Sequence, residues 1–210
     1  MSAHVKVFGV PRTSTTFLES LLIRNLKVSS YVTHYGNKHL QAFTLEEMHE
    51  WVKDKPQVTE RFSHVLEDVI HPLVVIKNPY SWYQSINRFR KGNFKMGFDY
   101  GKYNESYRGW KKLLENPWLP FGKGFIMRYE DTLRDAEAVI TNLSKRTGIP
   151  MKLPFTIPTK VSQSDEFTKE RRKFYLSDGN FGLSNDLIKQ ITDVVDWKLM
   201  KFYGYKPKEN

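Results

Sequence analysis

Short apolar runs alternate along this chain with longer segments in which apolar residues recur every three or four positions. Three compact runs, at residues 5–10, 73–76 and 125–127, predict buried β-strands. A segment with helical spacing follows each run, so strands and helices are expected in alternation. Such alternation favours a mainly parallel sheet with right-handed crossovers. The pattern therefore predicts a three-layer α/β fold with helices flanking a central sheet.

Four segments carry the helical spacing. Asn78 can cap the second of these helices and Pro79 suits its first position, while Gly148 is expected to end the third. Residues 28–71 show no clear period. The positions that define the four helices are Phe17, Leu18, Leu21, Leu22 and Leu26; Tyr83, Ile86 and Phe89; Leu133, Ala136, Val139, Ile140 and Leu143; and Leu187, Ile188, Ile191, Val194, Val195, Leu199 and Phe202.

Length and composition fit one packed domain spanning residues 1–210. The chain is 40% hydrophobic and has no internal repeat or Gly/Ser linker. The apolar run at the N-terminus is too short for a signal peptide, and no stretch approaches the ~18 apolar residues of a membrane span. We therefore expect a soluble protein of the cytoplasm.

The charge balance points to an anionic partner without identifying it. Lys and Arg outnumber Asp and Glu by 33 to 23, which gives a net charge of +10. This excess suits a phosphorylated nucleotide, an acidic glycan, a nucleic acid or a membrane surface, and also an ordinary basic surface. The chain has no cysteine, which excludes disulfides, thiolate metal sites and a cysteine nucleophile.

A first candidate phosphate site lies in the polar turn at residues 11–16, between the first strand and the first helix. The turn reads Pro-Arg-Thr-Ser-Thr-Thr. A strand, a turn and a helix in this order direct backbone N–H groups and a helix N-terminus toward one point, which suits phosphate oxygens. The four hydroxyl residues can donate to such oxygens, and Arg12 can neutralise their charge. A Ser/Thr-rich helix cap is the alternative interpretation.

A second candidate site begins at Lys77, which ends the second predicted strand. Ligands of open α/β sheets gather at this end of the strands. Ser85 lies eight positions later, about two turns into the following helix. A surface lysine and an ordinary helical serine are the alternative interpretation.

Together these segments resemble the sulfotransferase family. Residues 11–16 are similar to its 5′-phosphosulfate loop, Pro-(Lys/Arg)-Ser-Gly-Thr-Thr, with Ser14 in place of the glycine. Lys77, Asn78, Pro79 and Ser85 resemble its 3′-phosphate element, Arg-Asn-Pro and a helical serine, with lysine in place of arginine. Arg-Tyr-Glu-Asp at residues 128–131 and Phe-Tyr-Gly-Tyr at residues 202–205 are further similarities.

The resemblance implies a P-loop nucleotide-kinase-like sulfotransferase fold and a reaction. A sulfuryl group would pass from 3′-phosphoadenosine 5′-phosphosulfate to an acceptor hydroxyl or amine by in-line displacement, leaving adenosine 3′,5′-bisphosphate, with no metal. The acceptor would be a small molecule or a glycan, and the sequence does not choose between them. Residues 28–71 are expected to contribute to the acceptor site.

The resemblance also implies residue roles. Arg12 stands at the position of the family's catalytic cation. His39 is the first choice for the general base, with Lys38 beside it and His34 as the alternative. The residues expected to bind the nucleotide are Arg12, Thr13, Ser14, Thr15, Thr16, Lys77 and Ser85, with Arg172 and Lys173 as weaker candidates in a basic run that also fits a solvated helix face.

Other readings remain open. A nucleotide-binding phosphotransferase on the same fold is disfavoured because residues 11–16 lack the glycines and lysine of the ATP-binding loop. A nucleic-acid-binding protein is disfavoured because Lys and Arg are interleaved with Asp and Glu. A relative that binds nucleotide without catalysis also fits. The aromatic residues Trp82, Tyr83, Tyr103, Tyr107 and Trp110 fit either a ligand platform or, more simply, core packing.

Overall fold

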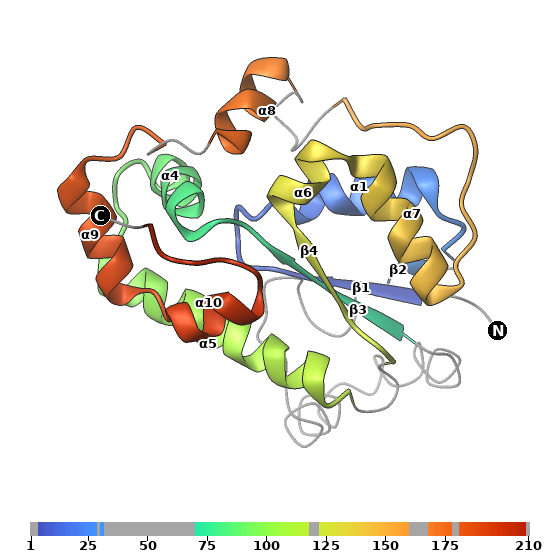
Figure 1. Cartoon of the computed structure of the whole chain (residues 1–210), viewed down its shortest axis with the longest axis horizontal. Coiled ribbons are helices and arrows are strands. Elements are labelled where there is room, and N and C mark those ends of the chain that lie inside the picture. Colours follow the sequence, from blue (N-terminus) through green and yellow to red (C-terminus); the bar gives the residue numbers. More distant parts are fainter. Residues whose placement is uncertain are drawn as a thin grey trace.

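The computed structural model describes residues 4–28, 30–31, 70–117, 122–159, 168–177 and 181–208. In this part of the chain a sheet of four parallel strands has the order β2-β1-β3-β4 (Figure 1). The strands are β1 (His4–Phe8), β2 (Ser30–Tyr31), β3 (Ile70–Ile76) and β4 (Phe125–Arg128). The helices are α1 (Thr15–Asn25), α4 (Pro79–Phe89), α5 (Met96–Glu115), α6 (Tyr129–Arg134), α7 (Ala136–Thr147), α8 (Lys169–Leu176), α9 (Asn185–Val194) and α10 (Trp197–Phe202).

Helices cover both faces of the sheet. Val7 and Val75 pack with residues of α1 and α7 in one buried cluster. Phe8 and Val74 belong to a second cluster with residues of α4, α5, α9 and α10. Side chains alternate across a strand, so neighbouring residues supply opposite layers. Figure 1 shows α1 and α7 on one side of the strands and α5 and α10 on the other. The predicted three-layer α/β architecture with a parallel sheet is confirmed.

Two of the predicted helices are interrupted, so the expectation of continuous helices was wrong there. The third divides at Asp135 into α6 and α7, and the fourth divides at Asp196 into α9 and α10. In each case the aspartate caps the second helix. Its carboxylate accepts a hydrogen bond from the backbone N–H of Ala138 or Leu199, both at 2.9 Å. Short polar side chains that bind nearby N–H groups favour helix starts over helix interiors.

Helix α5 was not predicted, because its buried face is aromatic rather than aliphatic. Three tyrosine hydroxyls on this face donate to main-chain carbonyls in and just beyond the end of β3. The pairs are Tyr107 with Val75 (2.8 Å), Tyr103 with Lys77 (3.1 Å) and Tyr100 with Pro79 (2.9 Å). Three or four helical residues advance about 4.5–6 Å and two extended residues about 6.6 Å, so the two repeats stay close to each other over this short distance. The aromatic stripe on α5 is therefore core.

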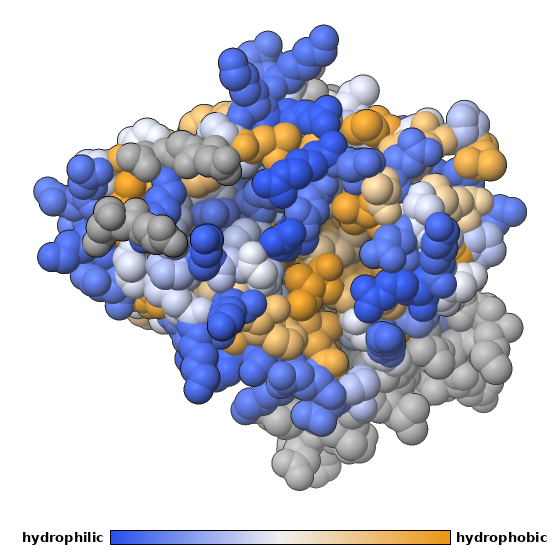
Figure 2. All heavy atoms as spheres, in the orientation of Figure 1, coloured by the Kyte–Doolittle hydropathy of each residue, from blue (hydrophilic) through white to orange (hydrophobic). Residues whose placement is uncertain are grey.

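The surface is predominantly polar on the face drawn in Figure 2, where smaller hydrophobic patches lie near the middle. Within the described residues, no helix combines the length and apolar character needed to cross a membrane. The cytoplasmic location and the single domain over residues 1–210 stay predictions.

Candidate functional site

The two predicted phosphate-binding segments lie at the same edge of the sheet. β1 and β3 are parallel neighbours whose pairing ends with Phe8 opposite Val74, so the segments that follow them emerge together. They are also joined directly, because the indole N–H of Trp82 on α4 donates to the carbonyl oxygen of Pro11 at 2.8 Å. Sequence reasoning weighed Trp82 only as core or ligand platform and missed this link between the two segments.

The turn at residues 11–14 has an unusual backbone. Arg12 and Ser14 both have φ of 70°, in the left-handed region that favours glycine. Ser14 is the N-cap of α1, yet its side chain makes no capping hydrogen bond. The residue that departs from the family's glycine thus occupies a conformation that glycine adopts most easily.

Close packing at Gly9 holds this turn against β3. A Cβ atom there would lie 2.7 Å from Oγ1 of Thr13 and 3.0 Å from the carbonyl oxygen of Val75. A Cβ contact as short as the first is essentially not seen in proteins, so a larger residue here would force the turn or the strand to shift, and glycine is favoured. Sequence reasoning did not single out Gly9, although a glycine directly after a strand is the available signal.

The side chains of the turn face different surroundings. Thr13 is fully buried and its hydroxyl donates to the carbonyl oxygen of Val10 at 2.7 Å, which stabilises the turn. Thr15 is buried, Ser14 is half-buried and Thr16 is exposed. The guanidinium carbon of Arg12 lies 5.3 Å from the ring centre of Phe89. Phe89, expected on the packed face of its helix, is instead 62% exposed.

Lys77 and Ser85 form a buried pair, as their spacing suggested. The ammonium of Lys77 donates to the Ser85 hydroxyl at 2.6 Å, and Lys77 is only 2% exposed. Tyr175 of α8 completes the group. Its hydroxyl lies 3.0 Å from the Ser85 hydroxyl, and its ring centre lies 3.7 Å from the Lys77 nitrogen. A hydroxyl acceptor and an aromatic face together stabilise a buried ammonium.

The other predicted residues are placed as follows. Arg172 and Lys173 are exposed on α8, and the Arg172 guanidinium donates to the carbonyl oxygen of Arg134 at 2.8 Å. α8 reaches Lys77 through Tyr175, which sequence reasoning did not identify. The general-base candidates His34, Lys38 and His39 lie outside the described residues.

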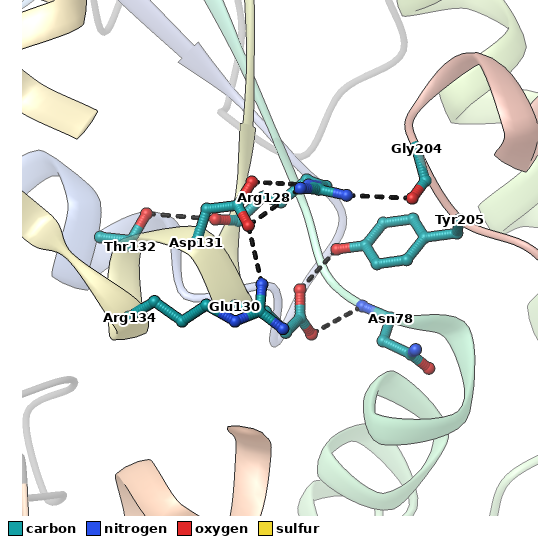
Figure 3. A network of polar contacts seen from close by, with 8 residues as sticks. All are labelled: Asn78, Arg128, Glu130, Asp131, Thr132, Arg134, Gly204 and Tyr205. Carbon is teal, nitrogen blue, oxygen red and sulfur yellow. Dashed lines mark hydrogen bonds and ion pairs between the residues drawn. The ribbon is translucent and has the colours of Figure 1, made fainter. Parts of the chain in front are cut away.

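A polar network at the end of β4 borders the Lys77 group (Figure 3). Glu130 is buried, and one carboxylate oxygen accepts the backbone N–H of Asn78 at 2.9 Å while the other accepts the Tyr205 hydroxyl. Arg128 makes two hydrogen bonds to Asp131, at 2.6 and 2.9 Å, and one to the carbonyl oxygen of Gly204 at 3.0 Å. The hydrogen bond with Asp131 raises the pKa of Arg128, so this guanidinium stays charged.

A cleft of about 650 Å³ opens beside this network. Asn78 and Tyr175 line it, so it adjoins the Lys77 group. Its walls also carry four cationic side chains and the carboxylate of Glu130. The cations are Arg128, Arg134, Lys206 and Lys208. The volume is in the range of small-molecule sites. Arg128 and Arg134 pair with Asp131, but the four cations still outnumber the carboxylates of Glu130 and Asp131, which favours an anionic ligand.

Among solved structures the chain is similar to the sulfotransferase domain of the olefin synthase from Synechococcus PCC 7002. The TM-score is 0.50 and the identity 15%, over 98% of this chain and 94% of that one. At this identity the similarity shows the fold, which is that of a sulfotransferase domain. No protein-family model and no curated protein sequence matches the chain.

Proposed function

We propose that this protein is a sulfotransferase that uses 3′-phosphoadenosine 5′-phosphosulfate and transfers its sulfuryl group to an acceptor hydroxyl or amine. The observation that carries the proposal is the joining, at one sheet edge, of the two segments proposed to bind anions. The turn of Arg12 and the segment of Lys77 are held together by the hydrogen bond from Trp82 to Pro11. A nucleotide with an anionic group at each end requires two such segments at a fixed separation.

The residues proposed to bind the 3′ side of the nucleotide, Lys77 and Ser85, fit a phosphate. The Lys77 nitrogen and the Ser85 hydroxyl are 2.6 Å apart, so both can donate to oxygens of one phosphate. The Tyr175 ring lies against the buried Lys77 nitrogen, so we expect this ring to move aside when an anion binds there. The cationic cleft beside Tyr175 offers a route for such a ligand.

The residues proposed to bind the 5′ side of the nucleotide, Arg12, Ser14 and Thr16, fit a phosphosulfate. Arg12 supplies a positive charge, and the hydroxyls of Ser14 and Thr16 lie at the N-terminus of α1, where the helix dipole favours an anion. The donor supplies the sulfuryl group, and adenosine 3′,5′-bisphosphate leaves.

During transfer, a bond forms between sulfur and the acceptor atom while the bond from sulfur to the bridging oxygen breaks. Arg12 would neutralise the charge that accumulates on that oxygen. A base must take the acceptor proton, and His39 is the first candidate, with His34 as the alternative and Lys38 beside His39. The proposed acceptor is a small molecule or a glycan, and no metal is proposed.

Calorimetry with adenosine 3′,5′-bisphosphate and with ATP tests the nucleotide site. We expect the bisphosphate to bind more tightly than ATP. Arg12→Ala and Lys77→Met should each weaken its binding by about ten- to a hundredfold, since each removes charge-assisted hydrogen bonds. Lys112→Ala, which removes an exposed cation on α5, is the matched control and should leave binding unchanged. Equal binding of ATP, or unchanged binding in both site variants, would refute the proposal.

Catalysis needs a separate assay. Release of adenosine 3′,5′-bisphosphate from the donor should depend on an added acceptor, drawn from a panel of phenols, sugars and amines. Arg12→Ala should abolish acceptor-dependent release. If Arg12→Ala bound adenosine 3′,5′-bisphosphate normally and turned over at the wild-type rate, Arg12 would be excluded from the reaction.

A further inference from the structure

The peptide unit between Lys77 and Asn78 is held at both ends by side chains from two different helices. Its carbonyl oxygen accepts the Tyr103 hydroxyl at 3.1 Å, and its N–H donates to a Glu130 carboxylate oxygen at 2.9 Å. Because a peptide unit is planar and its two polar groups point in opposite directions, bonds at both ends fix the plane. α5 thus holds this unit from one side and the first turn of α6 holds it from the other.

Glu130 is itself fixed in place (Figure 3). It is 7% exposed, and its second carboxylate oxygen accepts the Tyr205 hydroxyl. Burial, together with the nearby Glu130, raises the pKa of Tyr205 well above its ordinary value, so the phenol remains a donor. The main chain beside Tyr205 is tied to β4 by the hydrogen bond from Arg128 to the carbonyl oxygen of Gly204. The carboxylate therefore has little freedom to turn.

This peptide unit lies between Lys77 and the start of α4, the two parts of the chain that carry the groups proposed to bind the 3′-phosphate. The side chain of Lys77 leaves the backbone directly before it. α4, which carries Ser85, starts directly after it, and its cap is formed by the Asn78 side chain accepting the Tyr80 N–H at 3.0 Å. A change of ψ at Lys77 or of φ at Asn78, which these two bonds oppose, would turn the Lys77 side chain relative to α4. It would separate the Lys77 nitrogen from the Ser85 hydroxyl.

We propose that Glu130 is a positioning residue for the anion site formed by Lys77 and Ser85. It acts through the Asn78 N–H, and it sets the preference of the site for a nucleotide with a 3′-phosphate. The inference rests on the proposed function, because it assigns the 3′-phosphate to Lys77 and Ser85. The neighbouring Asp131 differs in its contacts, since it binds Arg128 and Arg134.

The test compares two ligands, adenosine 3′,5′-bisphosphate and adenosine 5′-monophosphate, by calorimetry. The ratio of their affinities reports the 3′-phosphate site. Glu130→Ala should lower this ratio about tenfold, the effect of one charge-assisted hydrogen bond, with little change in binding of the monophosphate. Glu130→Gln should restore most of the ratio, because its amide oxygen still accepts the Asn78 N–H. Glu137→Ala, which removes an exposed carboxylate on α7, is the control and should keep the wild-type ratio.

A merely structural role for Glu130 would weaken both ligands together and leave the ratio unchanged, which would overturn the inference. If Glu130→Ala does not fold, Tyr205→Phe replaces it, since that change leaves the carboxylate in place without its second donor. The ratio should then fall by about two- to threefold, and an unchanged ratio would overturn the inference as well. A wild-type protein that does not prefer the bisphosphate would instead refute the proposed function, on which the inference depends.

Discussion

The backbone at Ser14 predicts that glycine is the better residue there. Ser14 has φ of 70° and ψ of 29°, where the Cβ of an L-residue crowds the following carbonyl. The conformation costs a residue with a Cβ about 1–2 kcal/mol. Its side chain makes no capping hydrogen bond to α1, so Ser14→Gly removes the crowding without removing a bond to that helix.

Two opposing terms set the expected size of the effect. Glycine relieves about 1–2 kcal/mol in the folded state, but its freer unfolded chain offsets about 0.5–1 kcal/mol of this gain. Combining the two ranges gives a net increase in the free energy of unfolding between about 0 and 1.5 kcal/mol, with a midpoint of about 0.75 kcal/mol. For a chain of this length the midpoint corresponds to a rise in Tm of about 1.5–3 °C.

Urea unfolding followed by circular dichroism would measure the change, with two matched controls. Ser14→Ala keeps the Cβ and should bring no gain. Ser20→Gly makes the same substitution inside α1, where glycine is unfavourable, and should lose roughly 0.5 kcal/mol. If Ser14→Gly were as destabilising as Ser20→Gly, the reasoning from the left-handed backbone would be refuted.

Three further predictions concern stability. Gly9→Ala would place a Cβ 2.7 Å from the Thr13 hydroxyl, so it should destabilise the fold by about 1–3 kcal/mol in urea; unchanged stability would contradict the close packing. The hydrogen bond from the Leu199 N–H lowers the pKa of Asp196 in the folded protein. The ionised carboxylate therefore stabilises the fold above the ordinary carboxyl pKa, and this stabilisation is lost as the pH falls through the lowered pKa. Asp196→Asn should therefore be less stable than wild type at neutral pH, and the urea midpoints of the two proteins should converge in acid. Burial raises the native pKa of Tyr103 and Tyr107 well above the usual value near 10. Their contribution to the free energy of unfolding is therefore complete below about pH 10 and is lost at higher pH. Their tyrosinate absorbance should appear together with alkaline unfolding, and titration within the folded protein would contradict this.

The fold could be predicted where local pattern and tertiary packing agree. The strand at residues 73–76 is a β-branched and aliphatic run buried on both faces, and it pairs in parallel with β1. α5 could not be predicted from aliphatic spacing, because its packing depends on tyrosines whose hydroxyls find carbonyl partners only once β3 is in place. The breaks at Asp135 and Asp196 depend on one carboxylate each, which the apolar spacing does not report.

The candidate site was predictable to the extent that its members are close in sequence. The resemblance of Lys77 and Ser85 to the family's 3′-phosphate element, at the same eight-residue spacing, suggested that they act together. Tyr175 lies 90 positions from Ser85, and its contact depends on how α8 packs, so no local signal identifies it. Glu130 and Asp131 are adjacent and alike in the sequence, yet only the first reaches the Asn78 N–H, because helix α6 turns their side chains in different directions.

The three tyrosine bonds to the end of β3 have a consequence for the order in which the protein opens. Just beyond the last residue paired with β4, α5 rather than another strand supplies the donor to the Lys77 carbonyl group. None of the three bonds survives departure of α5, so this helix and the strand end must separate in a single event. The amide hydrogens around Lys77 and Asn78 and those along the middle of α5 should therefore exchange with one shared free energy of opening. In this respect α5 takes the place of a neighbouring strand at the end of β3.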